Sequence, residues 1–355
     1  MSTPDNPEVV VVTGASAGLG RAIVQKFAEQ GAHIGLIARG RDRLESAKRD
    51  VEAAGGRALV ISADVADAQA VDDAAEQVER ELGPIDIWVN NAMTAVFSPV
   101  KEMQADEYRR VTEVTYLGQV HGTLAALKRM LPRDRGVIVQ IGSALAYRSI
   151  PLQSSYCGAK HAVLGFTQSL RTELLHYKSN VQVTMVQMPG LNTPQFDWVK
   201  SRLPNHPKPL GAWYEPEVGA EAVVWAAHNP RREVKVGYPT LEAVYGNKLL
   251  PGVGDQYLAD VGFKGQQTDE AVSPDRPNNL WEPVPGDYGA RGSFSKGAKD
   301  FSPAAWLATK GEWAAIAGAA LVGVALGALT KNHKDSRDDS GSHDAVEQQH
   351  LSEAR

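Results

Sequence analysis

The chain of 355 residues has one cysteine and no apolar segment at its N-terminus. The single thiol of Cys157 excludes an internal disulfide, and the first seven residues lack the apolar core of a signal peptide. We therefore expect the globular part of the chain in the reducing cytoplasm. A lone cysteine on a buried helix is usually a small packing residue, so we assign Cys157 no redox role.

Clustered positive charge and metal-ligand patterns are also missing from the sequence. The formal net charge is −5 at pH 7 and the pI is about 6.0, so we expect no nucleic-acid partner. The nine histidines show no spacing typical of metal ligands, and no metal site is predicted. No fixed-period repeat is visible, which argues against a repeat protein.

Most of the chain alternates between strand-like and helical patterns. Short apolar runs predict seven strands, at residues 9–12, 34–37, 58–62, 85–89, 136–141, 181–188 and 233–237. Helical apolar periodicity fills the intervals between these runs, which is typical of a doubly wound parallel sheet. The sequence thus predicts an α/β fold with a seven-stranded, doubly wound parallel sheet, forming one domain over residues 1–263.

A glycine-rich turn follows the first predicted strand. Gly14, Gly18 and Gly20 have the spacing GxxxGxG, and a helical pattern follows them. Glycines at such a turn let the backbone approach a pyrophosphate, which the N–H groups and dipole of the helix N-terminus then bind. The turn therefore predicts a nucleotide site, and Ser16 and Leu19 within it are predicted to contact the ligand.

The residue that ends the second predicted strand indicates which nucleotide binds. About twenty residues after a glycine loop, an NAD-binding fold usually carries an acidic residue for the ribose 2′-hydroxyl. This chain has Arg39, with Arg41 and Arg43 close behind. Arginine pairs with phosphate, so we predict NADP(H) as the cofactor.

Three polar residues provide a proton-transfer pattern. Tyr156 and Lys160 are four positions apart in a helical segment, so their side chains leave the same face, and Ser143 precedes them. A nearby ammonium lowers the pKa of a phenol, so we expect Lys160 to make Tyr156 a usable acid or base. Such a pair alone is also common on solvated helix faces.

Together these motifs resemble the short-chain dehydrogenase/reductase family, whose members have a single Rossmann-type domain. The resemblance runs from about residue 9 to residue 237. It is carried by Thr13-Gly14 through Gly20, Ala63-Asp64-Val65, Asn90-Asn91-Ala92, the trio Ser143, Tyr156 and Lys160, and Pro189-Gly190 with Thr193. It implies that Ser143 orients a substrate carbonyl, Tyr156 gives or takes the proton, and Lys160 tunes Tyr156 and binds the nicotinamide ribose.

The resemblance also assigns the other cofactor contacts. It implies that Asp64 and Val65 contact the adenine, that Asn91 and Ala92 close the fourth strand beside the cofactor, and that Pro189, Gly190 and Thr193 cradle the nicotinamide.

Two positions depart from the family pattern. Met93 replaces the glycine that usually ends the Asn-Asn-Ala-Gly motif, and Thr115 stands where the family usually has an asparagine that supports a water-linked proton path. A hydroxyl can serve part of that role, so Thr115 is included among the predicted catalytic residues. These departures bear on the rate and the proton relay more than on the class of reaction.

The segment after the sixth strand is rich in aromatic residues and proline. In the family this segment covers the substrate, so Phe196, Trp198, Trp213 and Tyr214 are predicted to form an apolar lid. A loop folded onto its own aromatic cluster is the alternative. The lid interpretation favours an apolar or aromatic carbonyl substrate.

The C-terminal part of the chain divides by composition. Residues 264–303 are polar and rich in proline and glycine, typical of a linker or an extended cover; residues 304–330 predict an apolar helix, and residues 331–355 a charged, disordered tail. The uncharged stretch 313–330 spans about 27 Å as a helix, just enough for a bilayer core. It predicts a membrane anchor with the N-terminal domain in the cytoplasm. A helix docked on the domain or on a partner is the alternative.

The leading functional hypothesis is an NADP(H)-dependent oxidoreductase that reversibly reduces a small-molecule ketone or aldehyde. A non-catalytic NADPH-binding scaffold or sensor at a membrane is the alternative, and an epimerase on the same fold is less favoured because no sugar-nucleotide pattern is present. The family resemblance further implies a homo-oligomer that pairs the helices around residues 115–131 and 156–175.

Overall fold

The protein was analysed as a computed structural model, which describes residues 7–273 and 275–311. By internal contacts the chain divides into two units, residues 1–305 and residues 306–355. In the second unit the description covers residues 306–311, which are helical. The first unit contains the sheet and the predicted site, and the rest of the description concerns it.

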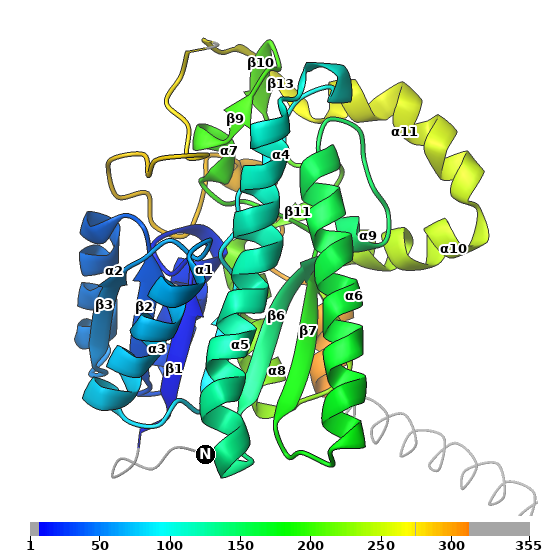
Figure 1. The fold of residues 1–355 in the computed structure, drawn as a ribbon. Helices are drawn as coiled ribbons and strands as arrows, with labels where there is room; N and C mark the ends of the chain where they lie inside the picture. The colour runs from blue at the N-terminus through cyan, green and yellow to red at the C-terminus, as the bar shows by residue number, and fades with distance from the viewer. Residues whose placement is uncertain (1–6, 274, 312–355) are drawn as a thin grey trace, which may run out of the picture. The chain divides into compact units, whose positions relative to one another are not determined.

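A seven-stranded parallel sheet forms the centre of the first unit (Figure 1). Its strands are β1 (Val9–Thr13), β2 (His33–Ala38), β3 (Ala58–Ser62), β4 (Ile87–Asn90), β6 (Val137–Ser143), β7 (Gln182–Met188) and β12 (Glu233–Lys235). Their order in the sheet is β12-β7-β6-β4-β1-β2-β3. The predicted fold is confirmed, and each predicted strand has a counterpart.

The central strands are largely apolar because helices cover both faces of the sheet. All five residues of β1 are buried, for example. In Figure 1 the helices α3, α5 and α6 lie in front of the sheet and α8 lies behind it. The longer helices are α1 (Gly18–Ala28), α2 (Arg41–Ala53), α3 (Ala68–Leu82), α4 (Ala105–Thr112), α5 (Gly118–Met130), α6 (Ser154–His176), α8 (Pro216–His228) and α11 (Pro251–Gly265).

The strand order reverses at β1, which fixes where a ligand binds. The chain proceeds outward from β1 to β2 and β3, and then crosses back to pair β4 with the other edge of β1. The loops that follow β1 and β4 therefore part at the carboxyl end of the sheet and leave a crevice there. The glycine-rich turn follows β1, at this crevice.

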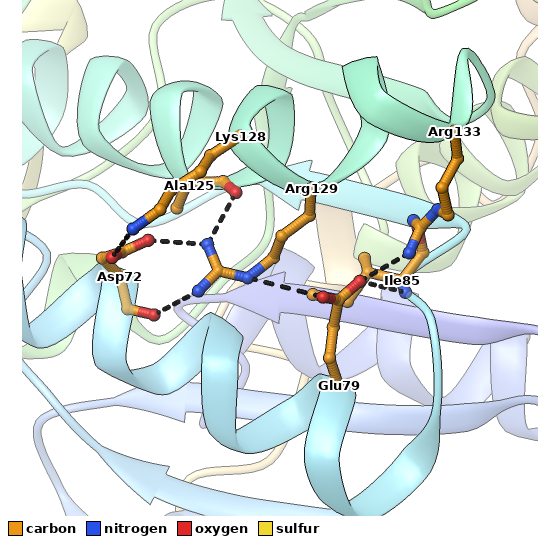
Figure 2. A network of polar contacts seen from close by, with 7 residues as sticks. All are labelled: Asp72, Glu79, Ile85, Ala125, Lys128, Arg129 and Arg133. Carbon is orange, nitrogen blue, oxygen red and sulfur yellow. Dashed lines mark hydrogen bonds and ion pairs between the residues drawn. The ribbon is translucent and has the colours of Figure 1, made fainter.

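An ion-pair network joins α3 to α5 away from the crevice (Figure 2). Arg129 of α5 donates to the carboxylate and the backbone carbonyl of Asp72 at 2.6 and 2.9 Å, and its Nε lies 3.8 Å from Glu79. Arg133 also contacts Glu79, at 2.6 Å. The Arg129 side chain is only 8% exposed, so this network adds paired polar contacts to the apolar packing between the two helices.

Short elements build a cap over the carboxyl end of the sheet. Three two-stranded sheets pair β5 (Val96–Phe97) with β9 (Lys200–Ser201), β8 (Gly190–Leu191) with β11 (Trp213–Tyr214), and β10 (Asn205–Pro207) with β13 (Gln267–Ala271). Short helical elements complete it: η1 (Val100–Glu102), η4 (Ala144–Ala146), α7 (Gln195–Trp198), α9 (Tyr238–Leu241), η5 (Glu242–Gly246), α10 (Asn247–Leu249) and η6 (Ser295–Gly297). Two others lie outside the cap: η2 (Glu113–Leu117) joins α4 to α5, and η3 (Leu131–Arg133) leads into the amino end of β6.

The described residues within 264–303 pack against the first unit. α11 runs to Gly265, β13 pairs with β10, and Leu280 is fully buried. The compact unit thus extends to Ala305, beyond the boundary at 263 that composition favours. Local composition does not reveal this because many of the contacts use backbone carbonyls or isolated polar side chains, which form no apolar pattern.

The apolar stretch 313–330 and the tail 331–355 lie outside the described residues. Among the residues that are described, no helix is both long enough and apolar enough to span a bilayer.

Candidate active site

The glycine-rich turn adopts a conformation that requires its glycines. Gly14 and Gly18 have φ angles of 67° and 58°, in the left-handed region that favours glycine. A Cβ on Gly20 would lie 2.0 Å from the carbonyl oxygen of Gly14, so any side chain there would displace the turn. The turn thus brings bare backbone to the N-terminus of α1, as binding of a pyrophosphate requires. The residues present fit a dinucleotide cofactor.

Hydrogen bonds from Thr13 and Asn91 fix this turn to the end of β4. The Thr13 hydroxyl accepts from the backbone N–H groups of Asn91 and Ala92 at 3.0 and 3.1 Å. The Asn91 side-chain amide donates in turn to the carbonyls of Thr13 at 2.9 Å and Gly14 at 3.3 Å. The two loops that form the crevice therefore move as one body. The sequence motifs assign no role to the Thr13 hydroxyl, although it holds the two loops together.

Arg39 lies at the carboxyl end of β2, on the expected side of the crevice. Its two terminal nitrogens donate to the backbone carbonyls of Trp281 at 2.5 Å and Asn279 at 2.6 Å. Burial lowers the pKa of the Arg39 guanidinium, and the nearby Asp64 carboxylate partly opposes that shift. Arg41 instead pairs with Glu45 on the surface of α2.

Asp64 is held between the backbone and a buried arginine. One carboxylate oxygen accepts from the Ala66 N–H at 3.0 Å, and the other accepts from Arg110 at 2.5 Å. Arg110 also donates to the Leu280 carbonyl at 3.0 Å. Asp64 is therefore fixed at the edge of the crevice where the resemblance implies the adenine.

The predicted catalytic trio comes from two elements. Ser143 is the last residue of β6, while Tyr156 and Lys160 lie in the first turns of α6. The Lys160 ammonium donates to the Ile141 carbonyl at 2.7 Å and lies 5.6 Å from the centroid of the Tyr156 ring. The Ser143 hydroxyl accepts from the Leu145 N–H at 3.1 Å. The three side chains thus converge on one wall of the crevice.

The pKa values of this pair differ from the sequence-based expectation. Burial raises the pKa of the Tyr156 phenol above its ordinary value, and a hydrogen bond with Ser143 offsets only part of the rise. Burial also lowers the pKa of Lys160 to about 7. The expected lowering of the phenol pKa is not found, because burial dominates the pKa of Tyr156. Tyr156 therefore keeps its proton at neutral pH, as a proton donor must.

The two positions that depart from the family pattern have different surroundings. Thr115 is fully buried in the π-helical turn η2. Its hydroxyl donates to the Thr94 carbonyl at 2.8 Å and accepts from the Thr94 N–H at 3.0 Å. Thr115 thereby fixes the loop that follows Asn91, and its part in a proton path stays a prediction. Met93 lines the crevice beside that loop.

One cavity of about 820 Å³ connects these groups. Its lining includes the whole trio and all the predicted cofactor residues; of the predicted site residues only Thr115 lies outside it. Phe196 and Trp198 of the expected lid also line the cavity. The other two lid residues face elsewhere, since Tyr214 is buried and the Trp213 indole donates to the Phe294 carbonyl at 3.1 Å.

The wall of the cavity formed by α10 and α11 is largely apolar, and no sequence motif marks it. It is formed by residues around α10 and α11, namely Leu249, Leu250, Val253, Tyr257 and Leu258, together with Arg148 from the loop after η4. Arg148 holds this region by donating to Asn247 at 3.0 Å and pairing with Asp255 at 2.5 Å. Glycines at 246, 252 and 254 interrupt the apolar periodicity there, so the pattern gave no clear signal.

Known proteins share these features. Residues 8–202 match the family described as short chain dehydrogenase. An uncharacterized oxidoreductase, YxnA, of Bacillus subtilis is 29% identical over 277 residues, which cover 78% of each chain. The 3-dehydrosphinganine reductase of Danio rerio is 35% identical over 192 residues, 53% of this chain and 57% of the relative.

A further relative and one solved structure agree with this match. A fatty acyl-CoA reductase of Acinetobacter baylyi is 29% identical over 228 residues, 63% of this chain and 75% of the relative. The fold resembles that of an alcohol dehydrogenase from Thermococcus sibiricus, solved with 5-hydroxy-NADP, with a TM-score of 0.55, 24% identity and coverage of 65% of this chain and 96% of the other. The family match, on top of the site geometry, establishes that this chain belongs to the short-chain dehydrogenases and is an NAD(P)-dependent oxidoreductase.

Proposed function

We propose that the protein reduces an apolar ketone or aldehyde with NADPH. The observation that carries this proposal is the convergence of Ser143, Tyr156 and Lys160 on a cavity that also contains the glycine-rich turn. A protein that only bound the nucleotide would have no need of the trio. The same geometry would permit the reverse oxidation of an alcohol.

In the proposed reaction the Ser143 hydroxyl orients the substrate carbonyl, and the Tyr156 phenol donates its proton to the carbonyl oxygen. The bound nicotinamide supplies the hydride. Lys160 would hold the nicotinamide ribose and favour the phenolate that forms when Tyr156 gives up its proton. Its own hydrogen bond to Ile141 keeps the ammonium beside the ring throughout.

Arginines at the end of β2 support NADP(H) over NAD(H). Arg39 and Arg43 line the cavity, at the end where an NAD-specific protein would carry an acidic side chain. A guanidinium binds a phosphate through charge-assisted hydrogen bonds, whereas NAD(H) offers only a hydroxyl there.

The apolar wall around α10 and α11 supports a substrate with a long apolar portion. Its aliphatic side chains offer apolar surface that a long hydrocarbon chain could cover, with Arg148 as a polar neighbour beside them. Two of the relatives are named as reductases of a fatty acyl-CoA and of 3-dehydrosphinganine. We propose that this protein acts on the same kind of substrate, a carbonyl compound with a long aliphatic chain.

The test is NADPH oxidation by the purified full chain against aldehydes and ketones of increasing chain length, with NADH as the comparison. The proposal expects turnover, a lower KM for longer chains, and a higher kcat/KM with NADPH. Binding of NADPH without reduction of any carbonyl would instead support the scaffold or sensor hypothesis.

Two further proposals concern membrane attachment and oligomeric state. We propose that residues 313–330 anchor the chain to a membrane, on composition alone. Cell fractionation of the full chain and of a chain ending after Ala305 tests this, since the anchor requires membrane association of the first only.

A homo-oligomer is supported by exposed apolar side chains on α5 and α6, such as Leu124 and Leu175, and light scattering would test it.

A further inference from the structure

We infer that residues 276–292 form a clasp that closes the cofactor site and limits the rate at which the cofactor leaves. This inference rests on the proposed binding of NADP(H). In Figure 1 the clasp belongs to the gold stretch that runs over the upper end of the sheet. Its residues come from the part of the sequence that composition favoured as a linker.

The clasp is anchored at its start beside the active site. Arg276 donates to the carbonyls of Phe196 at 3.1 Å and Val199 at 2.7 Å, which cap the short helix α7. The Asn279 N–H donates to the Trp198 carbonyl at 3.0 Å. Phe196 and Trp198 themselves line the cavity, so the clasp begins where the substrate and cofactor regions meet.

The next residues cover the end of the crevice where the adenosine half is expected. The Leu280 side chain is fully buried in an apolar cluster with Val96, Val111 and Ala159. The carbonyls on either side of it, those of Asn279 and Trp281, accept from Arg39. Leu280 therefore pins two carbonyl groups against the guanidinium at the end of β2.

This arrangement leaves Arg39 free to bind a phosphate as well. A guanidinium has five N–H donors in a rigid plane, and the clasp uses two of them. The remaining donors belong to a side chain that lines the cavity, and Asn279 and Pro283 of the clasp line it too. The clasp thus fixes the orientation of Arg39, which is the proposed partner of the 2′-phosphate. It also forms one wall of the cavity beside Arg39.

The second half of the clasp crosses the glycine-rich turn. The Gly289 carbonyl accepts from the Gly18 N–H at 3.0 Å, and the Asp287 carboxylate accepts from Ser46 at 2.5 Å. The Tyr288 ring lies 4.7 Å from that of Trp198, and the Arg43 guanidinium lies over both rings.

The clasp ends on the opposite side of the turn. The Gly292 N–H donates to the Asn192 carbonyl at 3.1 Å, and Arg291 pairs with Glu217 at 2.8 Å. A segment tied to α7, β2, α2, the glycine-rich turn and α8 spans the crevice from one side to the other. A dinucleotide lying along the carboxyl end of the sheet would have to pass it on leaving.

The decisive measurement is the rate of NADPH release from the full chain, followed by the loss of nicotinamide fluorescence after mixing with excess NADP. Leu280→Ala removes the buried anchor of the clasp. Leu174→Ala is the matched control, because it removes a buried leucine from the core at the C-terminal end of α6. Both variants should lower the melting temperature. Only Leu280→Ala should raise the release rate, by about tenfold, equivalent to about 1.4 kcal/mol.

A release rate for Leu280→Ala within about twofold of the Leu174→Ala rate would overturn the clasp while leaving the proposed function intact. If the wild type bound no NADPH, the proposed function would fail and the clasp with it. Should Leu280→Ala not fold, the double variant Asp287→Ala/Tyr288→Ala decides: faster release supports the clasp, and an unchanged rate overturns it.

Discussion

The two ends of the cavity are built by different means. At the cofactor end, hydrogen bonds of the buried residues Thr13 and Asn91 lock the turn after β1 to the end of β4. At the substrate end, α10 and α11 form an arm whose apolar side chains line the cavity and yet reach solvent; Leu249 is 78% exposed and Leu250 63%. Rigid backbone suits a ligand of fixed shape, whereas loosely packed aliphatic side chains suit ligands of varied length.

Removing the proposed proton donor, which lies between the two ends of the cavity, should have the largest effect on activity. Tyr156→Phe removes the transferable proton and little volume, so kcat should fall about 10²–10⁴-fold while NADPH binding stays near normal. Steady-state kinetics and fluorescence titration measure the two quantities. Retention of more than about a tenth of the wild-type rate would rule out Tyr156 as the proton donor.

The rigid end should tolerate no added methyl group. Gly20→Ala would force its Cβ against the Gly14 carbonyl and distort the turn, so we expect NADPH affinity to fall by about a hundredfold or more, equivalent to about 2.7 kcal/mol. Gly165→Ala in α6 is the control, because a Cβ there meets nothing within 4 Å. The control should bind normally and gain about 0.4–1 kcal/mol of stability. Equal affinities for the two variants would contradict the rigid-turn interpretation.

The preference for NADPH over NADH tests the role of Arg39, which lies at the edge of the cofactor end. Arg39→Asp should reduce the ratio of kcat/KM for NADPH to that for NADH by about tenfold to a hundredfold, because one or two charge-assisted hydrogen bonds are lost. Arg41→Asp makes the same charge change at a side chain that faces Glu45 instead. An equal drop in both variants would mean that net charge, and not the contact of Arg39, sets the preference.

The adaptable end should respond to substrate length. Leu250→Ala removes aliphatic surface from the arm, and its KM for a long-chain aldehyde should rise about fivefold to thirtyfold, given about 0.8 kcal/mol per buried methylene group. The KM for a short aldehyde should hardly change. Val100→Ala, at a side chain of η1 that is 63% exposed like Leu250 but lies outside the cavity, serves as the control. A uniform rise for all chain lengths would argue against an extended substrate site.

Stability in acid tests a contact that lies outside the cavity. Glu107 is 1% exposed and pairs with Lys200 and Arg202 at 2.8 Å, which joins α4 to the cap. Despite its burial, these contacts lower its pKa from 4.5 to about 2. The group binds fewer protons in the folded state, so its contribution is present above about pH 4.5 and is lost as the pH falls towards 2. Urea midpoints measured across that interval should fall more steeply for the wild type than for Glu107→Gln.

Much of the fold and of the cofactor end was predictable from the sequence. A central strand such as β1 appears as a continuous apolar run because the sheet is buried on both faces there, and the glycine spacing reflects a backbone conformation that other residues resist. Strand bounds shifted by one or two residues; the predicted run 85–89, for example, became Ile87–Asn90. Strongly periodic and sterically constrained features are the ones that local sequence encodes.

The substrate end and residues 276–292 were not predictable in the same way. Arg39 is held by carbonyl oxygens of Asn279 and Trp281, and any residue supplies a carbonyl, so no side-chain pattern marks that contact. The raised pKa of Tyr156 likewise depends on how deeply the folded chain buries it. Sequence spacing identified the pair but carried no information on its desolvation.

The contacts of residues 276–292 also bear on how the protein is made. Arg39 and Trp281 are 242 positions apart, and Ser46 and Asp287 are 241 apart. Contacts of such separation form late, because the chain must close a very long loop before any of them stabilises it. During synthesis the sheet and the glycine-rich turn can therefore assemble while the cofactor crevice is still open. Residues 276–292 follow the last strand of the sheet, which ends at Lys235, so under the proposed clasp the crevice closes only after the sheet is complete.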